Sequence, residues 1–425
     1  MFKRFSLIMV VLLLIVGSAY AQGTGPECFG SEGSALSILG SWAGEEEETF
    51  RQVIAPVIEA CNLTLSYEGT RDLNTVLPTR VDGGAPPDIA LLPNPGAIKT
   101  FANNLVALTD VGVNPDSYSE GWQQLGSVDG RWLGLPLKTD VKSLVWYSPV
   151  AFEAAGYSVP ATWDEFIALM DQMVADGGPA PLAMGFESGG ATGWTATDFV
   201  QDILLRTQGL EYVNGLVSGE TAWNDQGVVD AWTLYVEWVN KYGAGGADGA
   251  LTTSFGDAIL QPFQDPAAAW MVKQSGFAGS AFIQPNFPDY VYGEDFAFFV
   301  LPTADGEPAA MQVGGDFLGV FNDTPAVNAM IAYLSSADGA SAWAASGFDL
   351  TPNSAVDLGA YANPISADKA AALLSAPDVS FDVGDLMPPA VGQAEFDNIK
   401  AAVGGGDIVA LLNEIQAKYE EATGM

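Results

Sequence analysis

The stretch 128–170 reads VDGRWLGLPLKTDVKSLVWYSPVAFEAAGYSVPATWDEFIALM, and it shows how the chain is organised. A glycine turn at 129–130 precedes an apolar strand at 133–137. Lys138, Thr139 and Asp140 then interrupt the apolar pattern, and a second buried strand follows at 143–147. This part of the sequence therefore predicts two strands that are separated by a short polar segment.

Two helices are predicted directly after these strands. The first surrounds Ala151 and stops at Gly156. The second begins near Pro160, with Thr162 as the N-cap and Glu165 as its capping-box partner three residues later. Strands that are followed by helices in this way are typical of an α/β fold.

The segment 35–92 repeats the alternation of strands and helices. Apolar strands at 35–39, 63–67 and 89–92 are separated by helical patterns at 43–60 and 73–80. This order predicts a parallel, doubly wound sheet with right-handed crossovers. Ligands of such sheets bind at the carboxyl ends of the strands, so the loops 40–45 and 93–95 are candidate parts of a site.

The first 21 residues have the pattern of a secretory signal peptide. Lys3 and Arg4 precede an apolar run at 7–16, and Ala19-Tyr20-Ala21 forms a small-x-small cleavage site. The run is shorter than the roughly 18 residues that a membrane span needs. The pattern predicts a secreted chain that starts near Gln22 and is found in the periplasm or on the extracellular face of the cytoplasmic membrane.

Charge and composition exclude several classes of function. The net charge is −37, which disfavours a nucleic-acid partner, an anionic membrane surface and an anionic ligand. The chain has no histidine, which excludes Ser-His-Asp and Cys-His catalysis and zinc sites with histidine ligands. No loop has the alternating acidic pattern of a calcium site, and neither a metal nor another cofactor is predicted.

The chain contains two cysteines, Cys28 and Cys61. In a secreted protein, two cysteines commonly form a disulfide. We predict that these two are bonded; the alternative is a pair of free thiols.

Several sequence blocks resemble one known family, the extracellular solute-binding proteins that serve ABC importers, and in particular their carbohydrate-binding group. One block is the stretch 128–170 itself. The others are PPDIALL at 86–92, the small-residue strand and K-Q-S-G-F loop at 267–277, GGD at 314–316, NDTPAV at 322–327 and GFDLTPN at 347–353. The resemblance covers nearly all of the mature chain.

This resemblance implies a two-lobed fold of the type II periplasmic binding proteins, with a ligand cleft between the lobes. The first lobe would comprise 34–142 and 300–345, and the second 143–299 and 346–425. The chain would cross between the lobes near 140–144 and near 299–311, and the lobes would close about this hinge. The family also implies a monomer that meets the permease subunits in the membrane.

Nine residues near predicted strand ends are candidates for ligand contact, because sugars are held by carboxylates, amides and aromatic rings. Other roles remain open: packing for the first tryptophan, helix capping for the glutamate, turn formation for the asparagine, and pairing with nearby acids or glycine amides for the lysine and the last aspartate. The candidates are Trp42, Glu45, Asn94, Asp140, Trp194, Lys273, Gln274, Phe277 and Asp316.

We interpret the sequence as a receptor that captures an oligosaccharide, such as an α-glucoside, for an importer. A receptor of the same fold for a polyol or another uncharged solute is the alternative. A secreted glycoside hydrolase with two carboxylates is disfavoured, because no pair of acids stands out and the family carries no catalytic residues. An adhesive or structural protein is disfavoured because the sequence has no repeats.

Overall fold

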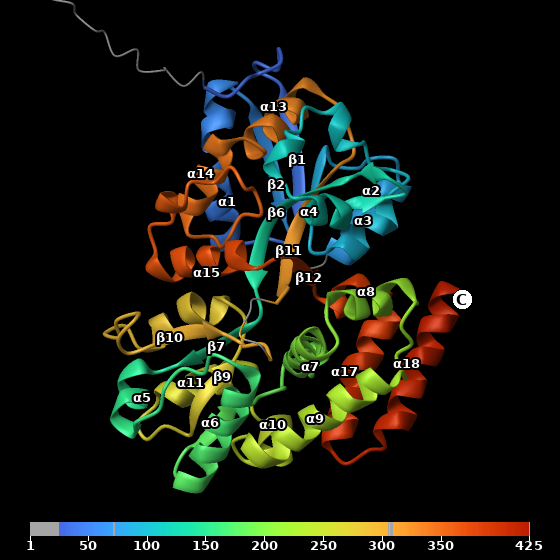
Figure 1. The fold of residues 1–425 in the computed structure, drawn as a ribbon. Coiled ribbons are helices and arrows are strands. Elements are labelled where there is room, and N and C mark those ends of the chain that lie inside the picture. The colour runs from blue at the N-terminus through green and yellow to red at the C-terminus, as the bar shows by residue number, and fades with distance from the viewer. Residues whose placement is uncertain (1–24, 71–72, 305, 307–308, 425) are drawn as a thin grey trace, which may run out of the picture.

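The computed structural model describes residues 25–70, 73–304, 306 and 309–424. The predicted signal peptide, 1–21, lies outside the described residues. The chain forms two α/β lobes, one above the other in Figure 1, each built around its own sheet. The predicted fold class is therefore confirmed.

The first lobe contains a six-stranded sheet in the order β12-β11-β3-β1-β2, with β6 paired to β11. Strands β1, β2 and β3 are parallel, as predicted, whereas β11 runs antiparallel to β3 and to β6. The strands are β1 (Ala35–Gly40), β2 (Thr64–Gly69), β3 (Ile89–Leu92), β6 (Gly134–Val141), β11 (Met311–Val320) and β12 (Val379–Phe381).

Helices cover both faces of this sheet (Figure 1). They are α1 (Glu45–Ala60), α2 (Leu73–Asp82), α3 (Pro95–Phe101), α4 (Glu120–Leu125), α13 (Pro325–Leu334), α14 (Ala337–Ser346) and α15 (Pro364–Ser375). A short hairpin of β4 (Ser127–Val128) and β5 (Arg131–Trp132) precedes β6. Cys28 and Cys61 form the predicted disulfide, which ties the segment before β1 to the end of α1.

The second lobe contains a four-stranded sheet in the order β10-β7-β9-β8. Its strands are β7 (Leu144–Tyr147), β8 (Ala180–Ala183), β9 (Ala269–Lys273) and β10 (Ala297–Val300). Its helices include α5 (Pro149–Ala155), α6 (Trp163–Asp176), α7 (Trp194–Thr207), α8 (Leu210–Ser218), α9 (Gln226–Tyr242), α10 (Gly246–Thr252), α11 (Phe255–Leu260), α12 (Gln284–Asn286), α17 (Pro389–Val403) and α18 (Ile408–Thr423).

Local sequence signals explain where several of these helices begin. Thr162 accepts a hydrogen bond from the backbone N–H of Glu165, and the Glu165 carboxylate accepts one from the N–H of Ala161. This reciprocal pair is the predicted capping box of α6. The aromatic side chains of α9, Trp232, Tyr235 and Trp238, are fully buried, so they belong to the core of the second lobe.

The predicted assignment of 346–425 to the second lobe is wrong for its first part. Strand β12 pairs in parallel with β11 of the first sheet, and Phe381 packs on Phe317 with ring centroids 5.9 Å apart. Helix α15 lies in the same lobe (Figure 1). The chain enters the second lobe only after Phe381, through α16 (Val383–Leu386), which makes a third crossing between the lobes.

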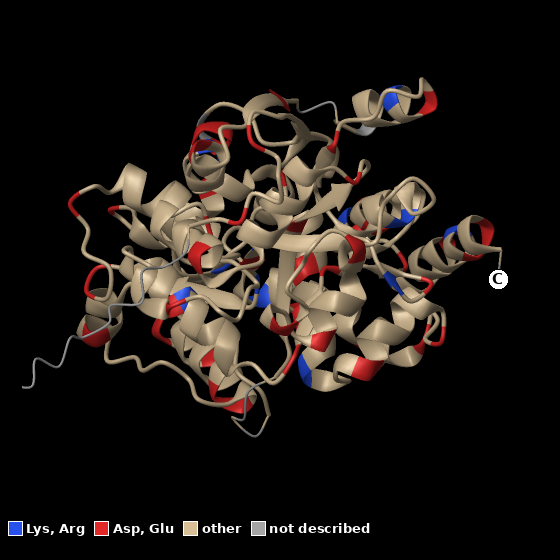
Figure 2. Cartoon of the chain, turned by 90° about the horizontal axis from the view of Figure 1, so that it is seen from above, with Lys and Arg blue, Asp and Glu red and all other residues tan. Residues whose placement is uncertain are grey.

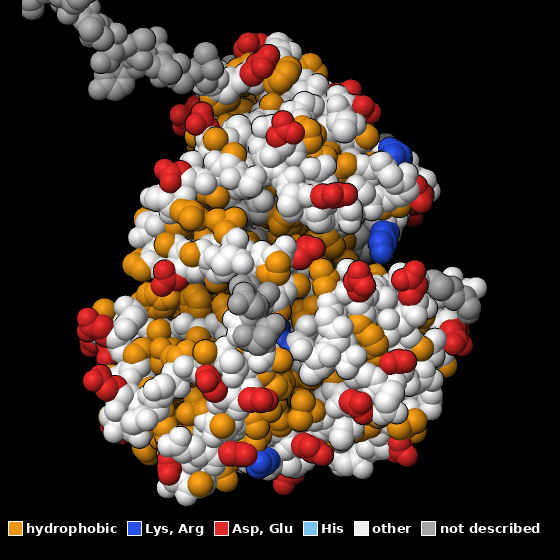
Figure 3. Space-filling view, viewed as in Figure 1, with side chains coloured by type: hydrophobic (Ala, Val, Ile, Leu, Met, Phe, Trp, Pro, Cys, Tyr) orange, Lys and Arg blue, Asp and Glu red, His pale blue; other side chains and the backbone are white. Residues whose placement is uncertain are grey.

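Acidic residues are spread over the whole chain, and basic residues are few (Figure 2). In the space-filling view, hydrophobic side chains gather along the boundary between the lobes, while the acids are scattered over the outer surface (Figure 3). None of the helices within the described ranges is long and apolar enough to cross a membrane.

Candidate functional site at the junction of the lobes

Sheet topology brings the candidate residues of the first lobe to one edge. The parallel strands β1 and β3 end at Gly40 and Leu92. Strand β11 runs in the opposite direction and pairs Phe317 with Leu92, so its first residues, before Phe317, extend beyond the ends of β1 and β3. Strand β6 ends at the same edge, because it runs antiparallel to β11, and it leads directly into β7 of the second lobe. This edge therefore faces the second lobe.

Lys138 and Asp316 form an ion pair at this edge, with Nζ 3.2 Å from Oδ2. Their side chains keep 21% and 15% of their surface exposed. Lys138 Nζ also lies 5.4 Å from the ring centre of Phe348. Burial raises the pKa of Asp316, and the charge of Lys138 offsets part of this rise. The pair thus offers a charged donor and acceptor beside an aromatic face.

Asp140 lies at the end of β6 and faces a loop of the second lobe. Its carboxylate accepts a hydrogen bond from the backbone N–H of Phe277 (3.2 Å). Lys369 Nζ lies 3.6 Å from Asp140 Oδ1 and 2.7 Å from Asp349. Burial and the charge of Asp349 raise the pKa of Asp140 to about 6. The Oδ1 atom is buried and faces the Lys369 ammonium group, so it is not open to solvent in this structure.

An aromatic patch on the second lobe, which we define as Trp194, Phe255, Phe277 and Phe282, lies next to Asp140. Trp194 is half-buried, and its ring lies 5.4 Å from Phe255 and 6.2 Å from Phe277. Phe282 packs against both Phe255 and Phe277. Half-exposed rings of this kind present apolar faces on which the C–H face of a sugar or another ring can lie.

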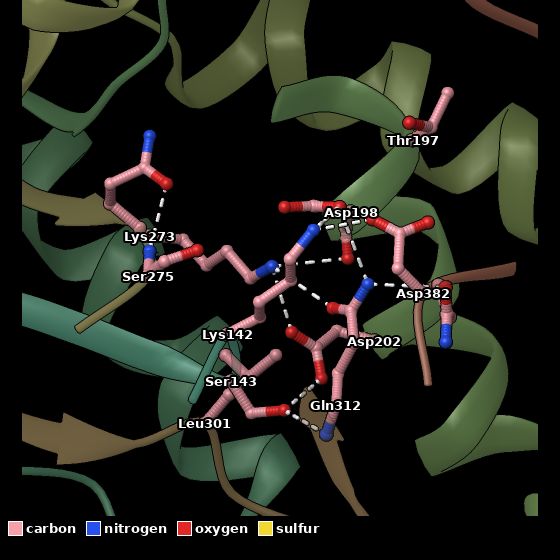
Figure 4. Close-up of polar contacts among 12 residues, drawn as sticks. Lys142, Ser143, Thr197, Asp198, Asp202, Lys273, Ser275, Leu301, Gln312 and Asp382 are labelled. Carbon is pink, nitrogen blue, oxygen red and sulfur yellow. Dashed lines mark hydrogen bonds and ion pairs between the residues drawn. The ribbon is translucent and has the colours of Figure 1, made fainter. Parts of the chain in front are cut away.

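Lys142, on the first crossing, is surrounded by carboxylates (Figure 4). Its Nζ atom pairs with Asp382 and lies 3.0 Å from Asp198 Oδ1. Burial raises the pKa of Asp198 to about 8; the charge of Lys142 offsets part of this rise, and the charge of Asp382 adds to it. For Asp382, the charge of Lys142 and several hydrogen bonds outweigh burial and lower the pKa to about 2. Burial and the neighbouring carboxylates also raise the pKa of Asp385, to about 7, and of Glu395. This cluster therefore keeps protons at neutral pH.

The retained proton predicts how stability depends on pH. An unfolded Asp has a pKa of roughly 3.9, so from about pH 4 to pH 8 the folded state binds a proton at Asp198 that the unfolded state has released. Because the folded state binds more protons in this window, Asp198 lowers the free energy of unfolding as pH rises. The asparagine of the Asp198→Asn variant cannot titrate. We therefore expect the free energy of unfolding of this variant, measured with urea, to fall less than that of the wild type between about pH 5 and pH 8.

An exposed aspartate provides the control for this measurement. Asp230 on α9 is exposed, and Asp230→Asn changes the net charge by the same amount as Asp198→Asn. We expect its pH slope to follow that of the wild type. Equal slopes for the two variants would show that Asp198 does not hold a proton.

The nine candidates divide into groups in the structure. Asp140, Trp194, Phe277 and Asp316 come together at the junction. Trp42 is only 2% exposed, packs on Phe50 and Phe348, and donates a hydrogen bond to the Asp316 carboxylate, so it is a buried support of the junction. The remaining four have other positions or are not described: Asn94, Lys273, Gln274 and Glu45.

Lys273 and Gln274 are buried, at 7% and 4% exposure, and they line a cavity of only 20 Å³. Lys273 Nζ lies 2.8 Å from Asp202 Oδ2 and 3.0 Å from the carbonyl oxygen of Asp198, within a buried network. The side-chain oxygen of Gln274 accepts a hydrogen bond from the N–H of Ser275. Lys273 is the last residue of β9 and Gln274 follows it, and both side chains are buried.

For Asn94 and Glu45, the sequence left open whether they contact a ligand or have a structural role. Asn94 is the N-cap of α3, and its side-chain oxygen accepts a hydrogen bond from the N–H of Ala97 (3.0 Å). This supports the structural role that its sequence context left open. Glu45 is the first residue of α1, and its side chain lies outside the described part of the structure.

Several residues of the junction were not singled out from the sequence: Lys138, Lys142, Phe255, Phe282, Phe348, Asp349 and Lys369. Lys138 stands in the same polar break as Asp140, so that segment could have identified it. Asp349 follows Phe348 in the G-F-D turn and adopts a φ of 149°, a strained backbone conformation that is typical of functional sites. No local signal identifies Lys369, which comes from the middle of α15.

A cavity of 350 Å³ lies in the first lobe, between α4, the loop 350–358 and α15. Leu350, Tyr361 and Leu373 contribute to its walls. None of the charged residues of the junction lines it, so we do not include it in the site. Within the described ranges, no group of three or more acidic or cysteine side chains is arranged to hold a metal ion.

Comparison with known proteins decides the family. Residues 43–341 match the bacterial extracellular solute-binding protein family. The chain is a member of this family. This solute-binding protein is 36% identical to the osmoprotective compounds-binding protein GgtB of Synechocystis sp., over 98% of this chain and 99% of the relative. It is 35% identical to the alpha-glucosides-binding periplasmic protein AglE of Rhizobium meliloti, over 86% of this chain and 82% of the relative.

Solved structures show the same fold at lower sequence identity. The solute receptor AcbH, described as preferring β-D-galactopyranose, superimposes with a TM-score of 0.76 at 19% identity and covers 93% of this chain and 99% of its own. A chitin oligosaccharide binding protein superimposes with a TM-score of 0.73 at 21% identity, over 93% and 100% of the two chains. At these identities the likeness establishes the two-lobed fold alone.

The family assignment confirms the resemblance that the sequence motifs indicated. The protein is the solute-binding component of an ABC transporter, and its family is found outside the cytoplasm, in the periplasm or the extracellular space. Members of this family are binding proteins and not enzymes.

Proposed function

We propose that this solute-binding protein captures a neutral carbohydrate, an α-glucoside or a related oligosaccharide, at the junction of its lobes and delivers it to the membrane permease. One observation carries the proposal: at this junction the aromatic patch lies beside hydrogen-bonding side chains of the other lobe. Asp140, of the first lobe, accepts a hydrogen bond from Phe277, of the patch. Rings and polar groups in such proximity suit a ligand that has both C–H faces and hydroxyl groups.

The charges of the junction favour a neutral ligand over an anion. Each of its lysines is already paired with a carboxylate: Lys138 with Asp316, Lys142 with Asp382, and Lys369 with Asp349. Asp140 adds a further acid. An anionic solute would therefore meet no unpaired positive charge here, whereas hydroxyl groups can both donate to carboxylates and accept from ammonium groups.

The names of the relatives point to the same class of ligand. One relative binds alpha-glucosides and another binds osmoprotective compounds. Both align with most of this chain. A micromolar dissociation constant corresponds to about −8 kcal/mol, which a few stacked rings and several buried hydrogen bonds supply.

In this proposal the protein binds and releases its ligand unchanged. Ligand contact with both lobes favours the closed arrangement, because the closed state gains contacts that the open state lacks. The closed protein then presents both lobes to the permease. Hydrolysis would need two carboxyl groups that flank a glycosidic bond; the acids of the junction are instead engaged with lysines.

A thermal-shift screen of the mature protein tests this function. The panel contains maltose, trehalose, sucrose and maltotriose, with mannitol as a polyol, maltobionate as an anionic sugar and glycine betaine as a non-sugar. We expect saturable stabilisation by one or more neutral glucosides, about 3 kcal/mol at a hundredfold excess over the dissociation constant. Maltobionate should stabilise less than maltose.

Other outcomes of the screen would change the assignment. Stabilisation by mannitol or betaine alone would replace the sugar with another uncharged or zwitterionic solute. Release of glucose from a sugar in the same wells, measured by chromatography, would show an enzyme. An equal response to maltobionate and maltose would contradict the charge argument.

A further inference from the structure

One helix, α7, contacts all three segments by which the chain crosses between the lobes. The crossings are 141–144, 300–311 and 381–383, the connections from β6 to β7, from β10 to β11 and from β12 to α16. Helix α7 belongs to the second lobe and is almost completely buried from Ala196 to Leu205. Its central position below the first sheet is visible in Figure 1.

The first crossing is held by two acids of α7 (Figure 4). Asp198 pairs with Lys142 at 3.0 Å, and Asp202 Oδ1 accepts a hydrogen bond from the hydroxyl of Ser143 at 2.5 Å. The Ser143 hydroxyl in turn accepts a hydrogen bond from the backbone N–H of Gln312, at the start of β11. Neighbouring crossings are thus joined to each other as well as to the helix.

Side chains of α7 bind the second crossing near Leu301 at its start and near Gln312 just after its end. Arg206 donates two hydrogen bonds to the carbonyl oxygen of Leu301, at 2.8 and 3.0 Å. Its guanidinium group also pairs with Asp202 at 2.5 Å, and both side chains are at most 1% exposed. At the other end, the side-chain amide of Gln312 lies 3.1 Å from that of Gln201.

The third crossing is held by Gln201. Its side-chain nitrogen donates to the hydroxyl of Ser380 (3.1 Å) and to the carbonyl oxygen of Phe381 (2.9 Å), and its oxygen accepts from the N–H of Val383 (2.9 Å). One buried amide therefore binds the backbone on both sides of the point where the chain changes lobe.

These residues and Trp194 lie on one face of the helix. Residues 194, 198, 201, 202 and 206 are spaced by about one, two and three helical turns, which places their side chains along a single stripe. Trp194 occupies the end of the stripe at the aromatic patch, with Lys142 Nζ 5.9 Å from its ring centre. The stripe thus connects a candidate ligand contact with every crossing.

We infer that α7 is the pivot of the lobe movement, and that Asp198, Gln201, Asp202 and Arg206 are positioning residues that couple the placement of Trp194 to the geometry of the hinge. The coupling to ligand rests on the proposed function, but the pivot itself does not. Buried, hydrogen-bonded side chains of α7 fix the crossings to the second lobe, so closure has to move the first lobe about the helix as a rigid body.

Interlobe distances measured by pulsed electron paramagnetic resonance, without ligand, test the pivot. Both native cysteines are bonded to each other, so spin labels can be attached to Asp82→Cys on α2 and Glu237→Cys on α9, which are exposed positions on opposite lobes. In the variant Gln201→Met the three bonds to the third crossing are lost. We expect its distance distribution to become wider than that of the wild type and its mean to shift.

Thr207→Val is the matched control. The Thr207 hydroxyl binds the carbonyl oxygen of Ile203 within α7 and touches no crossing, so this variant should keep the wild-type distribution. Arg206→Lys, which keeps the charge beside Asp202 but loses the paired bonds to Leu301, serves if Gln201→Met does not fold. Folded variants with wild-type distributions would overturn the inference. A failure of the sugar screen would leave this measurement intact, because it requires no ligand.

Discussion

Replacing Trp194 by alanine is expected to weaken sugar binding by about 10- to 100-fold, or ~1.5–3 kcal/mol, as for a central aromatic contact. The ring is half-buried beside Phe255 and Phe277 and next to Lys142. Its removal takes away the largest apolar face of the patch. Isothermal titration with the sugar that gives the largest thermal shift measures this loss.

Trp270→Ala is the control for this variant. Trp270 is also half-buried in the second lobe, but it lies at the start of β9 and packs on Tyr157, with ring centroids 5.0 Å apart. Its replacement should lower the melting temperature without changing affinity. If Trp194→Ala binds as tightly as the wild type, Trp194 is not part of the ligand site, and the aromatic patch loses its proposed role.

Replacing Asp316 by asparagine is expected to weaken binding by about tenfold or more, because hydrogen bonds to charged groups contribute roughly 1.5–3 kcal/mol. The substitution keeps the shape of the side chain but removes the charge that faces Lys138 at 3.2 Å. Burial lowers the pKa of Lys138, and the charges of Asp316 and Asp349 outweigh this effect and raise it. Lys138 therefore stays charged and turns toward Asp349 in the variant, away from the ligand.

Titration calorimetry and thermal unfolding together separate binding from folding for Asp316→Asn. The ion pair is partly exposed, so the loss of stability should be small compared with the loss of affinity. Asp230→Asn, on the exposed face of α9, should change neither quantity. An Asp316→Asn protein with wild-type affinity and a large drop in melting temperature would show that the Lys138–Asp316 pair is structural.

The two substitutions act on opposite sides of the junction. Trp194 belongs to the second lobe, and Asp316 to the first. If ligand binding closes the lobes, each single change also weakens contacts made by the other wall, and the double variant should lose less than the sum of the two effects. In the closed protein the ligand contacts both lobes at once. The contacts of one lobe with the ligand therefore depend on the contacts that the other lobe makes.

Features that depend on neighbouring residues could be predicted from the sequence alone. The alternation of strands and helices, the capping box of Thr162 and Glu165, and the strand ends at 40 and 92 follow from periodicity and local hydrogen bonding. The pairing of Cys28 with Cys61 followed from the number of cysteines. The polar residues 138–140 were expected to separate two strands, but they lie within β6, where they pair with β11, and the crossing follows only after Val141.

Only the tertiary structure decided which partners the charged residues have. Lys273 was expected in the cleft but pairs with Asp202, and Lys369 was not identified although it binds Asp349 and lies beside Asp140. The assignment of β12 to the first lobe likewise depends on its pairing with β11. Residues far apart in the chain make these contacts, and the free energy of a buried charge depends on its surroundings and not on its sequence neighbours. The sequence therefore determined the fold and the region of the site, while the packing of the lobes determined which side chains reach a ligand.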